Sequence, residues 1–254
     1  MIIKKIKNFI KEEKQLSIII NEIKKNFLKN KIILVGNSNN VLESKIGKEI
    51  DKFDIVVRFN GTPIKFYKDY IGVKTDVMAC NEEVCLNWCK TGIYTNESNW
   101  FKNGKKIKLN TAKFYHGQNF TKKNNLTFVV IETNKALKKI KILTKNKKII
   151  FFNNSLNHIL RYKIISKYNY FKKITSYLRG GNLTIGAILI SILNLAKINF
   201  YIHGFDLKKT TKNYSQYYHK FLHGKTNHSF KQENKILLNL LKKKKLIFFN
   251  KHLQ

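Results

Sequence analysis

The chain contains 254 residues, 43% of them hydrophobic, and has a formal net charge of +35. This length suits one large α/β domain with a full core, or at most two small ones. Only three of the 50 basic residues are arginine, which argues against a nucleic-acid reader, because such proteins use bidentate arginine contacts. The lysine excess has two compatible explanations: codon usage in an AT-rich genome, and attraction to an anion such as a nucleotide, an acidic glycan or a membrane surface.

Residues 1–28 are predicted to form a basic amphipathic helix. Its apolar residues recur at three- and four-residue spacing, with lysine on the remaining faces: Ile6, Phe9, Ile10, Leu16, Ile19, Ile20, Ile23 and Phe27. Two roles remain open, a helix docked on the rest of the chain and a helix lying on an anionic bilayer. The segment lacks the features of a signal peptide, and no run of 18 apolar residues occurs. We therefore expect a cytoplasmic protein, peripheral on the inner membrane in the second case.

Residues 29–254 are predicted to form a single domain. Seven apolar runs have the length of strands: Ile32–Val35, Phe53–Val57, Asp76–Cys80, Thr127–Ile131, Lys148–Phe152, Asn199–His203 and Leu246–Phe249. They alternate with helix-like stretches, which indicates an α/β fold with a mostly parallel sheet of about seven strands flanked by helices. Residues 81–126 are the least regular and are interpreted as a lid or a binding insert.

Three cysteines, Cys80, Cys85 and Cys89, lie within ten residues. Their C-x4-C-x3-C spacing lacks the second pair of ligands that a structural zinc site uses, and an odd number argues against a disulfide framework. We predict reduced thiols in a reducing compartment and no metal.

The first two predicted strands end in small polar groups. Gly36, Asn37 and Ser38 follow the first strand, and Arg58 and Asn60 close the second. Two parallel strands joined by a crossover bring their carboxyl ends to one edge, where ligands bind in open α/β sheets. We therefore predict a binding site at these ends, with Arg58 as a structural partner near it.

A second candidate site lies in the later half of the chain. Thr184 stands where a helix should begin, and the stretch 185–195 is apolar nearly all round. The start of such a buried helix offers unpaired N–H groups and the positive end of a dipole, which suit an anion. Simple capping by Thr184 and packing by Gly186 is the alternative. The strand that follows ends at His203-Gly204-Phe205.

His228 precedes a predicted helix start, because Ser229 and Gln232 have the spacing of a capping box. The positive end of that helix disfavours the imidazolium, so we expect a neutral ring near pH 7, as a general base requires. A solvent-exposed loop histidine is the alternative. Glu233, in the first turn, is interpreted as complementing the helix dipole.

These stretches resemble three motifs of the glycosyltransferase family 29 sialyltransferases. G-N-S, the I-D-x-F-D pair, V-V-R-F-N and G-x-K-T-D between Lys31 and Val77 resemble the large sialylmotif. T-x-G, the buried helix and the Gly-Phe end resemble the small one, and His228 with Glu233 resembles the very small one. T-x-G and G-F-D are also similar to the bacterial family 42 sialyltransferases. The resemblance implies a variant GT-A fold and inverting transfer of sialic acid from CMP-sialic acid to a glycan hydroxyl.

The resemblance also implies roles for individual residues. Asn37 and Asn60 would hydrogen-bond the phosphate and ribose of CMP, with Gly36 and Ser38 allowing close backbone approach. Three residues, Thr184, Ile185 and Gly186, would hold the donor at the sialic acid carboxylate or the cytidine. Gly204 would lie against the ribose, and His228 would take the acceptor proton.

The chain departs from the family in two places. The third motif normally starts with histidine before two aromatics, whereas here Tyr217 and Tyr218 precede His219. His219 or His223 would replace the histidine that contacts the donor phosphate, and the choice stays open. The positions of the vertebrate disulfide are apolar here, Ile33 or Leu34 and Ala196, which fits a cytoplasmic protein.

No D-x-D occurs, and such a carboxylate pair commonly holds Mg²⁺ in transferases that use sugar-nucleoside diphosphates. We therefore expect no metal and no cofactor. The expected partners are CMP-sialic acid and an acceptor oligosaccharide or glycolipid, such as a bacterial lipooligosaccharide or capsule, with no nucleic acid.

Three other functions have some basis in the sequence. An inactive or divergent CMP-sugar-binding homologue fits the altered third motif, and a basic nucleic-acid-binding protein fits only the charge. A Rossmann oxidoreductase would need G-x-G-x-x-G after the first strand, whereas this chain has G-N-S-N-N there. The sequence does not fix the acceptor, the linkage, or sialic acid against a related nonulosonate, because specificity is expected within 81–126 and 206–227.

Overall fold

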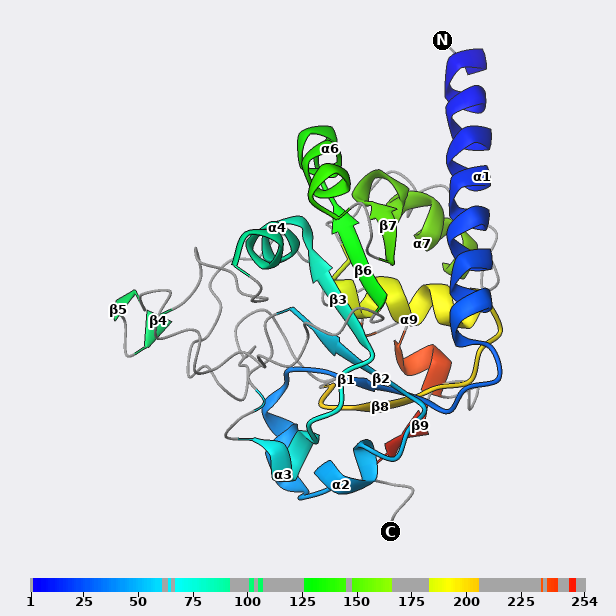
Figure 1. The fold of residues 1–254 in the computed structure, drawn as a ribbon. Coiled ribbons are helices and arrows are strands. Elements are labelled where there is room, and N and C mark those ends of the chain that lie inside the picture. The colour runs from blue at the N-terminus through cyan, green and yellow to red at the C-terminus, as the bar shows by residue number, and fades with distance from the viewer. Residues whose placement is uncertain are drawn as a thin grey trace.

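A computed structural model describes residues 2–60, 64, 67–91, 101–102, 105–106, 126–144, 148–165, 183–205, 234, 237–241 and 247–249. Its centre is a seven-stranded sheet with helices on both faces (Figure 1). The predicted α/β class, with a sheet of about seven strands, is confirmed.

The sheet has the strand order β7-β6-β3-β2-β1-β8-β9, and all neighbouring strands are parallel. The strands are β1 (Ile32–Val35), β2 (Ile55–Phe59), β3 (Val77–Asn81), β6 (Leu126–Ile131), β7 (Ile149–Asn153), β8 (Tyr201–His203) and β9 (Ile247–Phe248). The register pairs Val35 of β1 with Arg58 of β2 on one side and with His203 of β8 on the other. The carboxyl ends of β2, β1 and β8 therefore lie next to one another. Outside this sheet, β4 (Phe101–Lys102) and β5 (Lys105–Lys106) form a short antiparallel pair.

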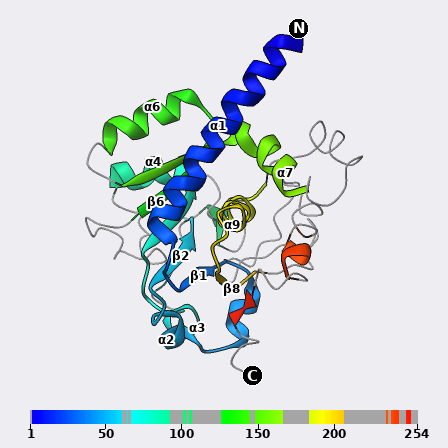
Figure 2. The ribbon, with the colours of Figure 1, turned by 90° about the vertical axis from the view of Figure 1, so that its right-hand side faces the viewer.

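The helices are α1 (Ile2–Phe27), α2 (Gly47–Ile50), α3 (Lys68–Ile71), α4 (Glu82–Thr91), α6 (Asn134–Leu143), α7 (Asn157–Ile165) and α9 (Ile185–Leu195), with 3-10 helices η1 (Asn39–Glu43) and η4 (Asn154–Leu156). Alternate strand residues point to opposite faces, so each face has its own core. Val77 and Ala79 of β3 pack with α1, α7 and α9, whereas Met78 and Cys80 pack with α4 and α6. The helices α2 and α3 cover the second face beside β1 and β2 (Figure 2).

The helix predicted over residues 1–28 docks on the first of these cores. Leu16, Ile19, Ile23 and Phe27 are buried against a core shared with α7 and α9. A hydrogen bond between Glu12 and His158 at 2.9 Å and an ion pair between Glu13 and Lys163 at 2.6 Å reinforce the contact. Within the described ranges, no helix is both long and apolar enough to cross a membrane.

The three cysteines lie together at the end of β3 and on α4, all as free thiols. A hydrogen bond with Cys80 and burial raise the pKa of the Cys85 thiol far above its usual range, against the opposite effect of a hydrogen bond with Cys89. Such a thiol stays protonated and unreactive. Among the described residues, no group of three or more histidine, cysteine or acidic side chains is arranged to hold a metal ion.

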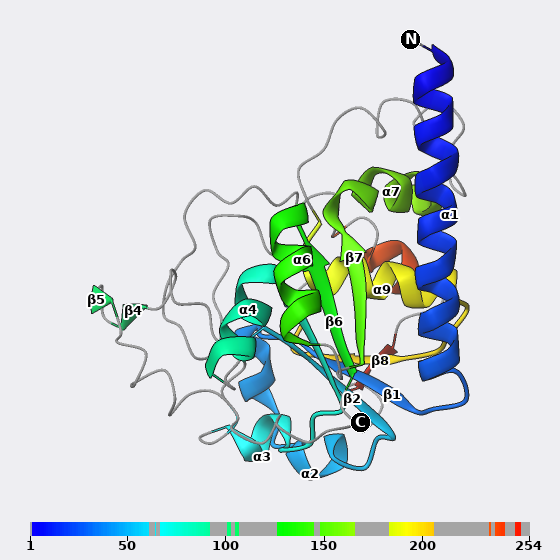
Figure 3. The ribbon, with the colours of Figure 1, turned by 45° about the horizontal axis from the view of Figure 1, so that its top comes forward.

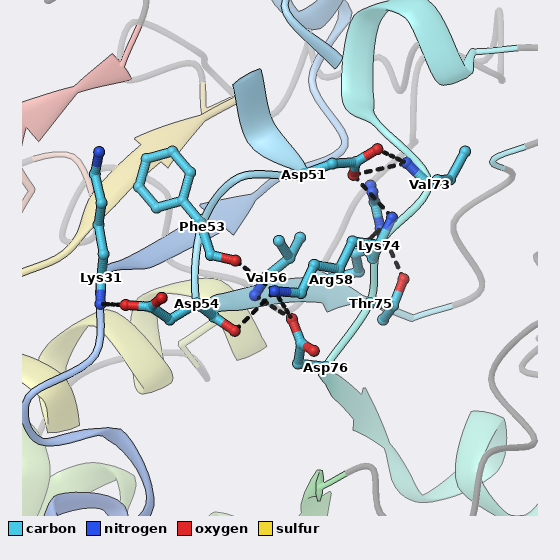
Figure 4. A network of polar contacts seen from close by, with 10 residues as sticks. All are labelled: Lys31, Asp51, Phe53, Asp54, Val56, Arg58, Val73, Lys74, Thr75 and Asp76. Carbon is cyan, nitrogen blue, oxygen red and sulfur yellow. Dashed lines mark hydrogen bonds and ion pairs between the residues drawn. The ribbon is translucent and has the colours of Figure 1, made fainter. Parts of the chain in front are cut away.

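A polar network joins the amino ends of the first three strands (Figure 4). The Lys74 ammonium donates to the carbonyls of Phe53 and Asp54 and pairs with the Asp76 carboxylate at 3.5 Å. Asp76 in turn accepts from the backbone N–H of Val56 at 2.8 Å. The residues of the I-D-x-F-D and G-x-K-T-D segments therefore support the sheet at the edge opposite the proposed binding site.

Arg58 belongs to the same network. Its side chain is fully buried. The guanidinium donates to the carbonyls of Ile71 at 2.7 Å and Lys74 at 3.1 Å and to the Thr75 hydroxyl at 2.9 Å. These bonds fasten the segment after α3 to β2.

The Asp51 carboxylate caps the chain that follows α3, because it accepts from the N–H groups of Val73 and Lys74 at 2.8 to 3.0 Å. We expect Asp51→Ala to lower the free energy of unfolding by about 1–3 kcal/mol, since two N–H groups lose a charged acceptor. Urea unfolding would measure the loss. Asp69→Ala removes an exposed carboxylate of α3 with no such bonds among the described residues, and should cost no more than about 0.5 kcal/mol. Equal losses in the two variants would contradict the capping role.

Candidate functional site

The carboxyl ends of β1 and β8 are joined by backbone contacts at unusually close range. The N–H of Gly36 donates to the carbonyl of His203 at 2.7 Å, and the N–H of Ser38 donates to the carbonyl of Gly204 at 3.0 Å. A Cβ atom on Gly36 would lie 2.4 Å from the Gly204 carbonyl oxygen. Gly204 has a φ of +73°, and a Cβ there would lie 2.3 Å from a methyl carbon of Val41. Neither position accommodates a side chain without movement of the backbone.

The helix α9 begins beside this contact. The Thr184 hydroxyl accepts from the N–H of Ala187 at 3.2 Å, so Thr184 is the N-cap. The N–H groups of Ile185 and Gly186, by contrast, have no acceptor among the described residues, and the first turn holds no acid. The positive end of the α9 dipole therefore lies at the carboxyl edge of the sheet, with no acidic side chain in the first turn to offset it.

Phe205 connects these parts. A Cβ on Gly186 would lie 3.1 Å from the ring of Phe205, and one on Gly36 would lie 3.0 Å from it. The same ring meets Phe59 at the end of β2 edge to face, with centroids 5.7 Å apart. Its carbonyl accepts from the Asn40 side chain at 3.1 Å. One residue thus contacts the ends of β1 and β2 and the start of α9.

Three asparagines lie at the carboxyl ends of three neighbouring strands: Asn37 and Asn60 shortly after β1 and β2, and Asn81 as the last residue of β3. The Asn37 amide donates to the carbonyl of Phe59 at 3.0 Å. Asn60 has a φ of +54°, and its side-chain oxygen accepts from the N–H of Asn81 at 3.3 Å. The Asn81 oxygen accepts from the N–H of Val84 in the first turn of α4 at 2.9 Å. Because the oxygen of Asn60 is engaged, its NH₂ group is the part that remains to donate to a ligand.

All eight residues predicted to bind the donor lie at this edge of the sheet. The set is Gly36, Asn37, Ser38, Asn60, Thr184, Ile185, Gly186 and Gly204. Arg58 is directed instead toward α3. His219, His223, His228 and Glu233 lie outside the described residues, so their roles stay predictions.

The sequence analysis did not identify Asn81, Asn40 or Phe205 as site residues. A signal for Asn81 was present, because it follows the third strand as Asn37 and Asn60 follow the first two. For Asn40 the contact spans 165 residues, and no local pattern indicates such a contact.

The arrangement can bind an anion through neutral donors. Residues 36–40, 59–60, 183–186 and 203–205 contain no Asp or Glu. Amide and backbone N–H groups converge there with a helix N-terminus, which together suit a phosphate or a carboxylate.

Comparison with curated proteins gives short but clear similarities. The chain is 48% identical over 48 residues to sialyltransferase-like protein 2 of Arabidopsis thaliana. It is 37% identical over 54 residues to β-galactoside α-2,6-sialyltransferase 2 of Bos taurus. These segments cover 19% and 21% of this chain, but only 11% of each relative.

The fold is similar to a solved one over a much longer span. A crystal structure of a mammalian sialyltransferase, in complex with Gal-beta-1-3GalNAc-ortho-nitrophenol, matches with a TM-score of 0.53 and 15% identity. The match covers 92% of this chain and 79% of the other. At this identity, the similarity shows the fold alone.

The family model of the glycosyltransferase family 29 sialyltransferases matches residues 3–245. That span is nearly the whole chain and includes the large, small and very small motifs together with the segments between them. The resemblance first indicated by short motifs is therefore confirmed over the full domain, while the additional likeness to family 42 stays a prediction. The chain belongs to glycosyltransferase family 29, the sialyltransferases.

Proposed function

We propose that this protein is a sialyltransferase that moves sialic acid from CMP-sialic acid to a hydroxyl group of an acceptor glycan, with inversion and without a metal ion. One observation carries the proposal: four elements meet at one edge of the sheet. Gly36 and Gly204 join the ends of β1 and β8. The adjacent ring of Phe205 packs against Phe59 at the end of β2 and Gly186 at the start of α9. Membership of the sialyltransferase family supports the reaction class.

Donor binding is assigned to neutral N–H groups. Asn60 holds its side-chain oxygen against the N–H of Asn81, so its NH₂ group is positioned to donate to the phosphate of CMP. The N–H groups of Ile185 and Gly186 at the start of α9, which have no acceptor in the described part of the chain, suit the second anion of the donor, the sialic acid carboxylate. Asn37 lies between these two groups of donors, fastened to the carbonyl of Phe59.

A metal-free reaction follows from the chemistry of this donor. CMP-sialic acid has one phosphate, whose charge amide and backbone N–H groups can stabilise as it develops. In a single displacement, the acceptor oxygen attacks the anomeric carbon from the side opposite CMP, the bond to the CMP oxygen breaks, and the acceptor proton passes to a base. We assign that base to His228, with His219 or His223 at the donor phosphate.

The acceptor is a glycan hydroxyl in this proposal. A bacterial lipooligosaccharide or capsule as its source stays a prediction from the sequence, as does the choice between sialic acid and a related nonulosonate.

Titration calorimetry with CMP, against UDP, GDP and NAD, tests the donor site. We expect selective binding of CMP that excess EDTA does not change. Asn60→Gly keeps the positive φ but loses the amide, so CMP affinity should fall roughly 10- to 100-fold, the equivalent of one hydrogen bond to a charged group. Lys197→Gly is the matched control, because exposed Lys197 also has a positive φ, +58°, and lies at the far end of α9.

Two results would contradict this assignment. Loss of CMP binding in EDTA would exclude the metal-free donor site. An unchanged CMP affinity in Asn60→Gly would remove Asn60 from the donor contacts.

Replacing the proposed base separates binding from chemistry. His228→Ala should lower kcat by roughly a hundredfold to ten-thousandfold while the affinity for CMP stays the same, since general-base catalysis acts on the acceptor. Transfer to a generic galactoside acceptor and CMP calorimetry on the same preparation would measure both. Near-normal kcat in His228→Ala would show that another group takes the proton. A wild-type protein that binds CMP but transfers nothing to any glycan would identify an inactive homologue.

A further inference from the structure

The docking of α1 leaves its opposite face uncovered. Leu16, Ile19, Ile23 and Phe27 are buried against the core. The residues of the other face are all exposed, and we name them the lysine–isoleucine face: Lys7, Ile10, Lys11, Lys14, Ile18, Asn21 and Lys25. At 3.6 residues per turn they fall within an arc of about 100°, opposite the docked side chains.

This face combines apolar side chains with positive charge. Ile10 and Ile18 are 59% and 56% exposed, among the larger exposures of a big apolar side chain in the described chain. Four lysines flank them, and no acid belongs to the face, although Glu22 borders it. Exposed isoleucines between lysines on one helix face are the combination that an interfacial helix presents to a bilayer.

The acids of α1 are distributed in the way that such a face requires. Glu12 and Glu13 are turned to α7, where they contact His158 and Lys163. Because both carboxylates contact α7, they do not offset the lysines of the uncovered face, which stays positively charged. The helix also extends past the other described elements at its N-terminal end (Figure 3), so this end of the face is accessible to a flat partner.

We propose that the lysine–isoleucine face binds an anionic lipid bilayer. In an interfacial helix, apolar side chains enter the boundary of headgroups and acyl chains, while flanking lysines extend to the headgroup charges. The two roles considered for this helix are thus compatible, because they use opposite faces. This inference goes beyond the proposed transfer reaction and does not depend on it.

Other partners fit the face less well. A second copy of the same face would bring four lysines against four lysines, which repel. A nucleic acid would use the lysines but would have no contact to offer Ile10 and Ile18.

Sedimentation with vesicles tests the proposal on the full chain. We expect binding to phosphatidylcholine vesicles that contain phosphatidylglycerol, and little binding to phosphatidylcholine alone. Neutralising the face in Lys7→Gln/Lys11→Gln/Lys14→Gln should lower the partition coefficient about 100-fold, because each lysine near an anionic surface contributes about fivefold. Removing the apolar contacts in Ile10→Ser/Ile18→Ser should lower it about tenfold or more at unchanged charge.

The helix α6 provides matched controls. Lys135→Gln/Lys138→Gln/Lys139→Gln makes the same charge change on three exposed lysines of another helix, and Ile142→Ser removes an isoleucine that is 67% exposed. Both should change vesicle binding less than threefold. Thermal unfolding and CMP calorimetry should be unchanged in every variant, which separates this test from that of the donor site.

Three results would overturn the proposal. Equal losses of vesicle binding in the α1 and α6 lysine variants would show that binding depends on the overall charge of the protein and not on this face. Unchanged binding in Ile10→Ser/Ile18→Ser would exclude insertion of the apolar side chains. A concentration-dependent dimer in sedimentation equilibrium, abolished by the same isoleucine variant, would identify a second copy as the partner.

Discussion

The close approach of Gly36 to Gly204 is the constraint on which the geometry of the site depends. Two backbones lie so near that a Cβ on either glycine would overlap the other strand end. Phe205, the next residue after Gly204, packs against Gly186 at the start of α9 and against Phe59 at the end of β2, so the contact also sets how these elements meet. A larger residue at either glycine would push the ends of β1 and β8 apart, and so would disturb the site without contacting a ligand.

The segment that resembles the large sialylmotif serves two opposite edges of the sheet. Asn37 and Asn60 lie at the carboxyl ends of β1 and β2. Asp51, Lys74 and Asp76 instead join the amino ends of the strands or the turn after α3. Arg58 links the two groups, because it lies two residues before Asn60 and its guanidinium holds the chain after α3. Many of the motif's polar residues therefore support the positions of the few that face the site.

The sequence predicted the sheet well for a physical reason. Its strands are buried on both faces, so they appear as continuous apolar runs between polar turns, and all seven runs overlap observed strands. The position of the proposed donor contacts at one edge was also predictable, because these residues follow strands β1, β2 and β8 or begin a helix. The links among them were not. The bond between Asn60 and Asn81 exists only because β3 is the neighbour of β2, and that strand order has no local signal. For the same reason, the sequence did not predict that Asp76 would join β3 to β2 at the amino ends of the strands, opposite Asn37 and Asn60.

Neutral donors suit the proposed reaction better than mobile cations would. As the bond to CMP breaks, negative charge grows on the phosphate, and only interactions that strengthen with that charge accelerate transfer. The carboxamide of Asn60 is held by Asn81, and the N–H groups at the start of α9 are fixed by the N-cap of Thr184. Such dipoles need no reorganisation when the charge appears, whereas a flexible lysine would have to be ordered first. Of the 50 lysine and arginine residues, 47 are lysine. Residues 36–40, 59–60, 183–186 and 203–205 nevertheless contain neither lysine nor arginine. In the proposed reaction, the lysines attract anions to the molecule at long range. The fixed carboxamide of Asn60 acts on the phosphate, whose charge grows during the reaction, and the N–H groups at the start of α9 hold the carboxylate, whose charge stays constant.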